Sequence, residues 1–172
     1  MSNNTKQDYV TPIWLIRLIE RAFGLCFVID LAASKENARC EYFFTKDDDA
    51  LKQDWARAIQ AYSSIMDLDD LVRGRRVPAA WLNPEFKQGA AFMEKAADEA
   101  SKGAVIVTLT LASVGASWYR DFVSQNAESL ITDRITFEGQ STVFNRDTML
   151  TFWGLGRRGL GWQNLKRLSA MY

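Results

Sequence analysis

The chain has 172 residues, 48% of them hydrophobic and 24% charged, which is the composition of a folded domain with one core. Its 21 basic and 21 acidic residues give a formal net charge of zero, so binding to nucleic acid would need a local basic surface. Histidine is absent, which excludes Ser-His and Cys-His nucleophile systems and argues against a zinc site.

Cysteine usage and the start of the chain indicate where the protein acts. Cys26 and Cys40 have no CxxC spacing, which is typical of thiols in a reducing cytoplasm. The first twelve residues, MSNNTKQDYVTP, are polar and contain no apolar signal core. No stretch of the sequence is long and apolar enough to cross a membrane. We therefore expect a cytoplasmic protein that has no membrane partner.

The hydrophobic pattern predicts helices and strands in alternation along the chain. In order, it predicts a helix over residues 13–23, strands over 26–34 and 41–46, a loop or short helix over 47–55, a strand over 77–84, a helix over 89–103, the clearest strand over 104–112, a helix over 117–127, and two late strands within 129–139 and 147–154 that can pair in antiparallel fashion. Segment 58–76 has an acidic part and then a basic part, and we interpret it as a surface insertion in a single domain of residues 1–172. The alternation predicts a three-layer α/β fold with a mostly parallel sheet.

The start of the first predicted helix carries a capping signal. Thr11 is placed to cap the helix and Pro12 to occupy its first position, and Gly24 is placed to end it. Tyr9 and Thr11 at such a helix start could also contact an adenosine or a carboxylate, with the help of the N–H groups there. Plain capping is the simpler interpretation of these residues.

Two polar residues, Asp30 and Asn83, lie at the carboxyl ends of predicted strands. Ligands of parallel α/β sheets bind beyond these ends, so we expect both residues to open onto one cavity. Asp30 is followed by Ala32 and Ala33, whose small side chains permit close approach of a ligand to the backbone. No GxGxxG pattern is present, which argues against a nicotinamide site. A loop acid or a helix cap is the other interpretation of Asp30.

The residues Asn83-Pro84-Glu85-Phe86 suit the methylation of an amine. The Asn83 side-chain oxygen and the Pro84 carbonyl can accept hydrogen bonds from a planar amine and hold its nitrogen toward a methyl donor. Proline fixes the backbone here, and the ring of Phe86 can stack on an extruded base. The step needs no strong general base, in agreement with a chain that lacks histidine. A turn that ends a strand is the alternative interpretation.

These motifs follow one another in a specific order: DYVTP, IDLAASKENARC, ALKQDW and AWLNPEF, and then DRITF at residues 133–137. Together they resemble the phage-type DNA N-6-adenine methyltransferases, the Dam-like group found in phages and prophages, over residues 8–153. The resemblance implies the Rossmann-like fold of class I S-adenosylmethionine-dependent methyltransferases. It also implies S-adenosylmethionine as cofactor, adenine in double-stranded DNA as substrate, and action in the cytoplasm of a bacterial host cell.

The resemblance further implies roles for individual residues. Asn83, Pro84 and Phe86 match the catalytic Asn-Pro-Pro-Tyr/Phe motif of the family. The residues that it implies in cofactor binding are Tyr9, Thr11 and Pro12 from the opening motif, Asp30, Ala32 and Ala33 with Asn37 in support, and an acid near Trp55 that is either Asp49 or Asp54.

The chain departs from the family pattern at two positions beside the expected pocket. Glu85 stands where the family has a second proline, which restores a backbone N–H and brings a carboxylate close to the target amine. That carboxylate can help to bind the amine, or it can misplace the base by about an ångström, which costs about a hundredfold in rate. Residues 111–113, Leu-Ala-Ser, also lack the proline of the family's Leu-Pro-Ala.

These departures keep two other functions open. One is a catalytically degenerate binding protein that retains the methyltransferase fold. The other is an amine methyltransferase that acts on RNA, a free nucleotide or a protein glutamine, because the same Asn-Pro chemistry serves any planar amine.

DNA contacts must come from basic residues outside these motifs. Clustered arginines near aromatic rings suit phosphate and base-stacking contacts, although solvated surface charge is an equally good interpretation. The candidates are Arg73, Arg75 and Arg76 in RGRR, and Arg157, Arg158, Lys166 and Arg167 in the tail, with Trp153 and Trp162 nearby. Their position in the sequence also brings Asn145 and Arg146 into consideration beside the target pocket.

Overall fold

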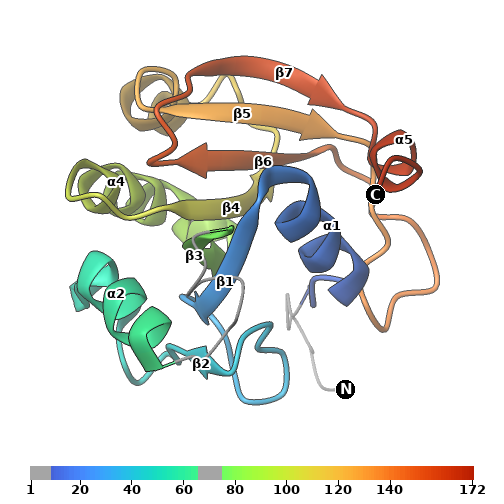
Figure 1. The fold of residues 1–172 in the computed structure, drawn as a ribbon. Helices are drawn as coiled ribbons and strands as arrows, with labels where there is room; N and C mark the ends of the chain where they lie inside the picture. The colour runs from blue at the N-terminus through green and yellow to red at the C-terminus, as the bar shows by residue number, and fades with distance from the viewer. Residues whose placement is uncertain (1–8, 66–74) are drawn as a thin grey trace, which may run out of the picture.

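A computed structural model describes residues 9–65 and 75–172 and shows an open sheet between layers of helices (Figure 1). The described elements are α1 (Ile13–Phe23), β1 (Leu25–Asp30), β2 (Tyr42–Phe43), η1 (Ala50–Lys52), α2 (Trp55–Ile65), β3 (Val77–Leu82), η2 (Phe86–Gln88), α4 (Gly89–Ser101), β4 (Ile106–Leu111), η3 (Tyr119–Val123), β5 (Ala127–Thr132), β6 (Thr148–Trp153), β7 (Gly159–Gln163) and α5 (Leu165–Ser169). Within these ranges, no helix is long and apolar enough to span a bilayer.

The described strands lie in the order β2-β1-β3-β4-β6-β5-β7. β2, β1, β3 and β4 pair in parallel, β6 pairs antiparallel with both β4 and β5, and β7 pairs in parallel with β5. β6 is therefore the one described strand that runs against the others. The prediction of a mostly parallel sheet is confirmed, as is the antiparallel pairing of the two late strands.

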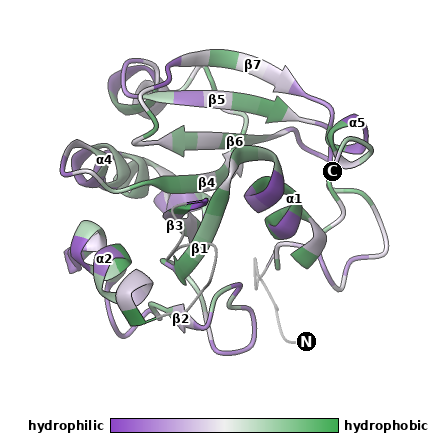
Figure 2. Cartoon of the chain, viewed as in Figure 1, coloured by the Kyte–Doolittle hydropathy of each residue, from purple (hydrophilic) through white to green (hydrophobic). Residues whose placement is uncertain are grey.

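Helices cover both faces of the sheet, which confirms the three-layer α/β fold (Figure 1). α1 and α5 cover one face through apolar side chains such as Ile19 and Leu168, and α2, α4 and η3 cover the other through Ile59, Met93 and Val123. Figure 2 shows hydrophobic residues concentrated in the central strands, and hydrophilic residues on parts of the helices. Each fully buried aliphatic side chain contributes about 1.5–3 kcal/mol, so the two apolar layers hold the sheet between them.

The structure corrects the predicted start of α1. Pro12 is the N-cap residue rather than the first helical residue, and the side chain of Thr11 does not cap the helix. The N–H of Ile13 instead donates to Glu138 Oε1 at 3.0 Å, so the cap comes from a residue 125 positions away in sequence. The predicted end is confirmed, because Gly24 adopts the left-handed conformation (φ 67°) that glycine tolerates best.

Segment 58–76 divides into two parts. Residues 58–65 belong to α2, where Ile59 is buried in the core between the helices and the sheet. Residues 66–74, including Arg73, lie outside the described residues, and the interpretation of this segment as an insertion rests on them. The single-domain interpretation of residues 1–172 stays a prediction.

The last third of the chain differs from the prediction in two places. Residues 119–123 form a π-helical turn, η3, and β5 already begins at Ala127, so the helix predicted over 117–127 is shorter than expected. The basic tail adds β7 to the edge of the sheet and then α5, neither of which the sequence pattern predicted. Glycines at positions 159 and 161 weaken the strand pattern of β7, which is recognisable only from its pairing with β5.

Candidate active site

A cavity of about 1110 Å³ opens at the carboxyl ends of β1 and β3. Asp30 is the last residue of β1 and Asn83 directly follows β3, and both line this cavity. The expectation that the two loops share one cavity is therefore met. Its volume exceeds the about 300–1,000 Å³ that is usual for a small-molecule pocket.

Most of the residues singled out in the sequence line this cavity. Its wall includes Tyr9, Thr11, Asp30, Ala32, Ala33, Asn37, Asp49, Asn83, Pro84, Glu85 and Phe86. Pro12 and Asp54 are not among the described residues of the wall: Pro12 caps α1, and Asp54 Oδ1 accepts a hydrogen bond from the N–H of Arg57 in α2. Of the two acids left open near Trp55, the structure brings Asp49 to the cavity. Their roles in binding stay predictions.

Asp30 is enclosed by the loop that follows β1. Its carboxylate accepts hydrogen bonds from the N–H groups of Ala32 (3.3 Å) and Arg39 (3.0 Å), so the chain wraps around it. Asn37 tightens the same loop, because its Oδ1 accepts from the N–H of Ser34 at 2.6 Å. Burial raises the pKa of Asp30 to about 6, against the opposing effect of the two N–H groups and the Arg39 charge. Asp30 is thus a buried acid poised close to neutral pH.

The side chain of Asn83 is fixed in one orientation. Its Nδ2 donates to the carbonyl of Tyr9 (2.9 Å) and to the hydroxyl oxygen of Thr11 (3.2 Å). These two acceptors use both amide hydrogens, and no donor among residues 9–65 and 75–172 contacts Oδ1. The amide therefore offers an acceptor at the cavity wall, and the hydroxyl of Thr11, which is 2% exposed, helps to orient it.

Two lysines hold the carboxylate of Glu85, the residue that departs from the family pattern. The ion pair to Lys46 Nζ measures 2.5 Å and that to Lys87 Nζ measures 3.7 Å. The hydrogen bond from Lys46 and the charges of both lysines lower the pKa of Glu85. The carboxylate is therefore ionised at neutral pH and engaged by cations that also line the cavity.

An aromatic cluster packs around Tyr9 and Phe86, the two of its rings that line the cavity. The ring of Tyr9 lies 5.6 Å from that of Phe86, 5.1 Å from Phe137 and 4.9 Å from Phe144, measured between centroids. Phe144 also lies 5.9 Å from Phe86. Sequence reasoning missed Phe144, although it reached the next two residues by position; a lone aromatic residue in a polar loop gave no periodic signal.

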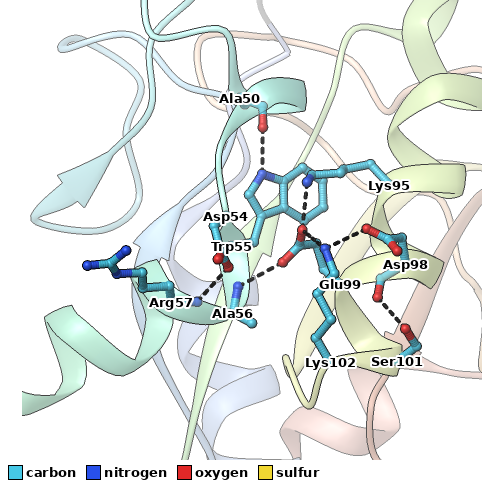
Figure 3. Close-up of polar contacts among 10 residues, drawn as sticks. All are labelled: Ala50, Asp54, Trp55, Ala56, Arg57, Lys95, Asp98, Glu99, Ser101 and Lys102. Atoms are coloured by element: carbon cyan, nitrogen blue, oxygen red, sulfur yellow. Dashed lines mark hydrogen bonds and ion pairs between the residues drawn. The ribbon is translucent and has the colours of Figure 1, made fainter.

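The turn that carries Asp49 is held by a hydrogen bond between the next residue, Ala50, and Trp55 (Figure 3). Asp49 has φ 49°, a left-handed conformation that aspartate tolerates better than most residues, and its carboxylate pairs with Lys52 at 2.6 Å. Directly after it, the carbonyl of Ala50 accepts a hydrogen bond from Trp55 Nε1 at 2.7 Å. Trp55 is completely buried, so it ties η1 to the core.

The same region contains a buried charge, Glu99 of α4 (Figure 3). Its Oε2 accepts from the N–H of Ala56 (2.9 Å), and its Oε1 accepts from Lys95 (2.6 Å) and Lys102 (2.9 Å). The ammonium group of Lys95 also lies 5.6 Å from the centroid of the Trp55 ring. Glu99, a side chain of α4, therefore accepts a hydrogen bond from an N–H group that the start of α2 leaves without a helical partner. The start of α2 in turn holds the preceding turn, which lines the cavity.

The predicted DNA-contacting arginines that the structure describes lie away from the cavity. Arg75 and Arg76 precede β3, and Arg157 and Arg158 precede β7, at the amino ends of strands that run in the same direction. The cavity lies at the carboxyl ends, across the sheet from these four residues. Arg157 also faces Glu128, at 3.8 Å.

The two tryptophans suggested for the DNA-contacting surface differ in exposure. Trp153 is 0% exposed and belongs to the core, so its suggested place in a DNA-contacting surface was wrong. Trp162 is 75% exposed on β7. Lys166 and Arg167 lie in α5, which follows the carboxyl end of β7 and so lies toward the edge of the sheet that carries the cavity.

Comparison with known proteins identifies the family. The model of the DNA N-6-adenine-methyltransferase (Dam) family matches residues 1–150. The chain belongs to the Dam family. A Dam-family relative from Escherichia phage T1, a DNA N-6-adenine-methyltransferase, is 27% identical over 121 residues, which are 70% of this chain and 42% of the relative. The chain thus spans less than half the length of this Dam relative. Its mixed α/β sheet is consistent with a methyltransferase fold.

Proposed function

We propose that this protein transfers a methyl group from S-adenosylmethionine to the exocyclic amine of adenine in DNA. The observation that carries the proposal is the single cavity lined by both Asp30 and Asn83 in a chain of the Dam family. The name of the phage T1 relative supports the same reaction and a phage or prophage origin, with action in the cytoplasm of the bacterial host.

The cavity residues fit S-adenosylmethionine. Tyr9, Thr11, Asp30, Ala32, Ala33 and Asp49 provide a ring, a hydroxyl, two carboxylates and two side chains small enough to expose the backbone. The cofactor supplies an electrophilic methyl group on a sulfonium. The enclosed carboxylate of Asp30 complements the positive charge of such a ligand, and the loop that it organises lines the cavity.

The residues around Asn83 perform the positioning that methyl transfer requires. Oδ1 of Asn83 and the carbonyl of Pro84 accept hydrogen bonds from the two N–H groups of the target amine and thereby turn its lone pair toward the methyl donor. Phe86 stacks on the base that has left the duplex, and Tyr9 and Phe144 support this ring. The proton of the methylated amine leaves to water, so no general base is needed.

The DNA duplex lies along the carboxyl-end edge of the sheet, because the target base has to enter the cavity there. Basic side chains toward this edge include Lys46 and Lys87 at the cavity, Arg146 beside Phe144, and Lys166 and Arg167 in α5. Phosphate contacts from such residues supply affinity independent of sequence. Arg157 and Arg158 lie at the other edge and contribute to this surface only if the DNA wraps around the sheet.

Glu85 is the observation that favours the alternative, a catalytically degenerate member of the family. The ion pairs with Lys46 and Lys87 compensate the charge of this carboxylate, but both ammonium groups are exposed, so the pairs do not decide between the two functions. Turnover by the unmodified protein would exclude the degenerate form.

Calorimetry with S-adenosylmethionine, followed by transfer of a labelled methyl group to an adenine-containing duplex, tests the proposal. We expect binding and transfer, and a loss of transfer of about 10²–10³-fold in Asn83→Ala, as for other residues that stabilise a transition state. Asn126→Ala removes an exposed amide away from the cavity and serves as the control. Binding without transfer to any DNA would refute the proposal, and transfer to RNA, nucleotides or protein glutamine instead would assign a different amine.

A further inference from the structure

The connection between β5 and β6, residues 133–147, is long for two neighbouring antiparallel strands, which about two to five residues usually join. β5 runs in the same direction as β1 and β3, so this connection leaves the sheet at the edge that carries the cavity. A connection of this length without regular secondary structure is uncommon in a compact domain and usually has a function. Apart from the ring of Phe144 and the charge of Arg146, the proposed reaction leaves this segment without a role.

The inner part of the connection is held firmly against the body of the protein. Ile135 and Phe137 are each 2% exposed and belong to the apolar layer between the sheet and α1. The backbone of Glu138 pairs with that of Val10, and its Oε1 accepts from the N–H of Ile13 at 3.0 Å. The outer part of the connection therefore starts from a fixed base, which lowers the entropic cost of binding a ligand there.

The outer part, residues 139–146, is exposed at every position except Phe144, and we call it the outer loop. The Phe144 ring turns back and lies 5.9 Å from the ring of Phe86, which stacks on the target base in the proposed reaction. Consecutive Cα atoms are about 3.8 Å apart, so the backbone of Asn145 lies one such step from that of Phe144. Stacked base pairs are about 3.4 Å apart, which brings the pairs that flank the target adenine within reach of the loop.

The outer loop has the side chains that read base edges. Its sequence, GQSTVFNR, contains two amides, two hydroxyls and one arginine, and no acid that would repel phosphate. Asn and Gln amides form paired hydrogen bonds with N6 and N7 of adenine, and Ser and Thr hydroxyls bond to bases more generally. Within residues 9–65 and 75–172, no group forms a hydrogen bond with the side chain of Gln140 or Asn145. Both exposed amides are therefore available to a ligand.

We propose that Gln140 and Asn145 contact the edges of the base pairs next to the target adenine and so determine the sequence at which the protein methylates DNA. The inference rests on the proposed function and adds specificity-determining residues to it. The partner is a DNA duplex, because the loop stands beside the point where the target base has to leave its pair. Arg146, the next residue, supplies a phosphate contact that carries no sequence information.

A library of random-sequence DNA duplexes tests the inference without knowledge of the recognition sequence. The library is incubated with S-adenosylmethionine and each variant, and sequencing locates N6-methyladenine, which gives the preference for each base at each flanking position. The unmodified protein is expected to prefer particular bases next to the methylated adenine. In Asn145→Ala and Gln140→Ala, we expect this preference to fall about 5- to 100-fold at one flanking position each, the discrimination of one paired amide contact.

Two further variants give readouts that a purely structural loop would not. Asn145→Asp keeps the size of the side chain but removes its donor, so the preferred base at that position is expected to change toward cytosine, whose amino group donates to a carboxylate. Arg167→Ala removes an exposed cation of α5 that is proposed to contact phosphate, and is expected to lower methylation of all sequences evenly. Gln140 and Asn145 are exposed, so their variants are expected to keep the fold, which circular dichroism checks.

The outcomes separate this inference from the proposed function. A preference left unchanged in the Gln140 and Asn145 variants, or methylation that they lower evenly on every sequence, overturns the role of the outer loop alone. Methylation of every adenine alike by the unmodified protein overturns it as well. Failure of the unmodified protein to methylate any duplex overturns the proposed function and, with it, the inference.

Discussion

Removal of the Glu99 carboxylate tests whether the buried charge behind the cavity wall holds the fold together. Glu99 is 0% exposed and accepts hydrogen bonds from Ala56, Lys95 and Lys102 (Figure 3). In Glu99→Ala, the N–H of Ala56 and the largely buried ammonium of Lys95 both lose their partner. Because Lys102 is half-exposed, water replaces its contact with little loss.

The expected magnitude follows from these contacts. Each hydrogen bond to a charged group is worth about 1.5–3 kcal/mol, and breaking a fully buried pair costs about 3–5 kcal/mol. The lower end applies here because Lys95 retains some exposure, so we expect Glu99→Ala to lose about 3 kcal/mol and roughly 6–12 °C in Tm. Glu99→Gln keeps an acceptor for Ala56 and should lose about half as much.

Urea denaturation followed by circular dichroism measures the loss. Asp98→Asn provides the matched control, because Asp98 pairs with the same Lys102 from an exposed position and should change the midpoint little. Burial disfavours the charged form of Glu99, but the hydrogen bonds from Lys95, Ala56 and Lys102 together lower its pKa below 4.5. The charge therefore stabilises the fold above about pH 4.5, and this stabilisation is lost as the pH falls below that value. Equal losses in Glu99→Ala and Asp98→Asn, or a loss from Glu99→Gln that persists unchanged at acid pH, would refute the reasoning.

Further predictions concern the cavity. Because burial raises the pKa of Asp30 to about 6, its ionisation should cost roughly 3 kcal/mol of stability as the pH rises from 4 to 7. Asp30→Asn should lack this pH-dependent loss when the free energy of unfolding is measured in urea. The same pH dependence of stability in both proteins would contradict the prediction. Phe144→Ala removes a ring that supports Phe86 and should lower kcat/KM for DNA about tenfold with cofactor affinity unchanged in calorimetry, whereas unchanged kcat/KM would exclude a role for this ring. Because Lys46 and Lys87 hold the carboxylate, Glu85→Pro should change turnover by far less than the about hundredfold of a misplaced base; activity that appears only in this variant would support the degenerate alternative.

The cavity shows how far local pattern reaches. Asp30 and Asn83 were found because each ends a hydrophobic run, and parallel strands bring such ends to one edge of a sheet. The roles of Thr11 and Arg39 were out of reach, because their decisive contacts are to Asn83 and Glu138, which lie 72 and 99 positions away. The capping signal at Thr11 was wrong, because Pro12 takes the N-cap position and the Thr11 hydroxyl accepts from Asn83.

The position of the basic clusters was also beyond what local sequence pattern predicts. Arg75, Arg76, Arg157 and Arg158 read as a DNA-contacting set because sequence reports charge without reporting which end of a strand carries it. Strand direction across β3 and β7 depends on pairing through β4, β6 and β5, which places all four at the edge opposite the cavity.

By itself, the sequence determined the three-layer α/β class, the helix of residues 13–23 with its glycine end, and the two strand ends that meet at the cavity. These depend on hydrophobic period and backbone preference, which act over a few neighbouring residues. Only the tertiary structure decided the partner of each polar group: Glu138 for Ile13 and Arg39, Glu99 for Ala56. A buried donor or acceptor is satisfied by whatever group the fold brings within about 3 Å, and that distance is set by packing rather than by proximity along the chain.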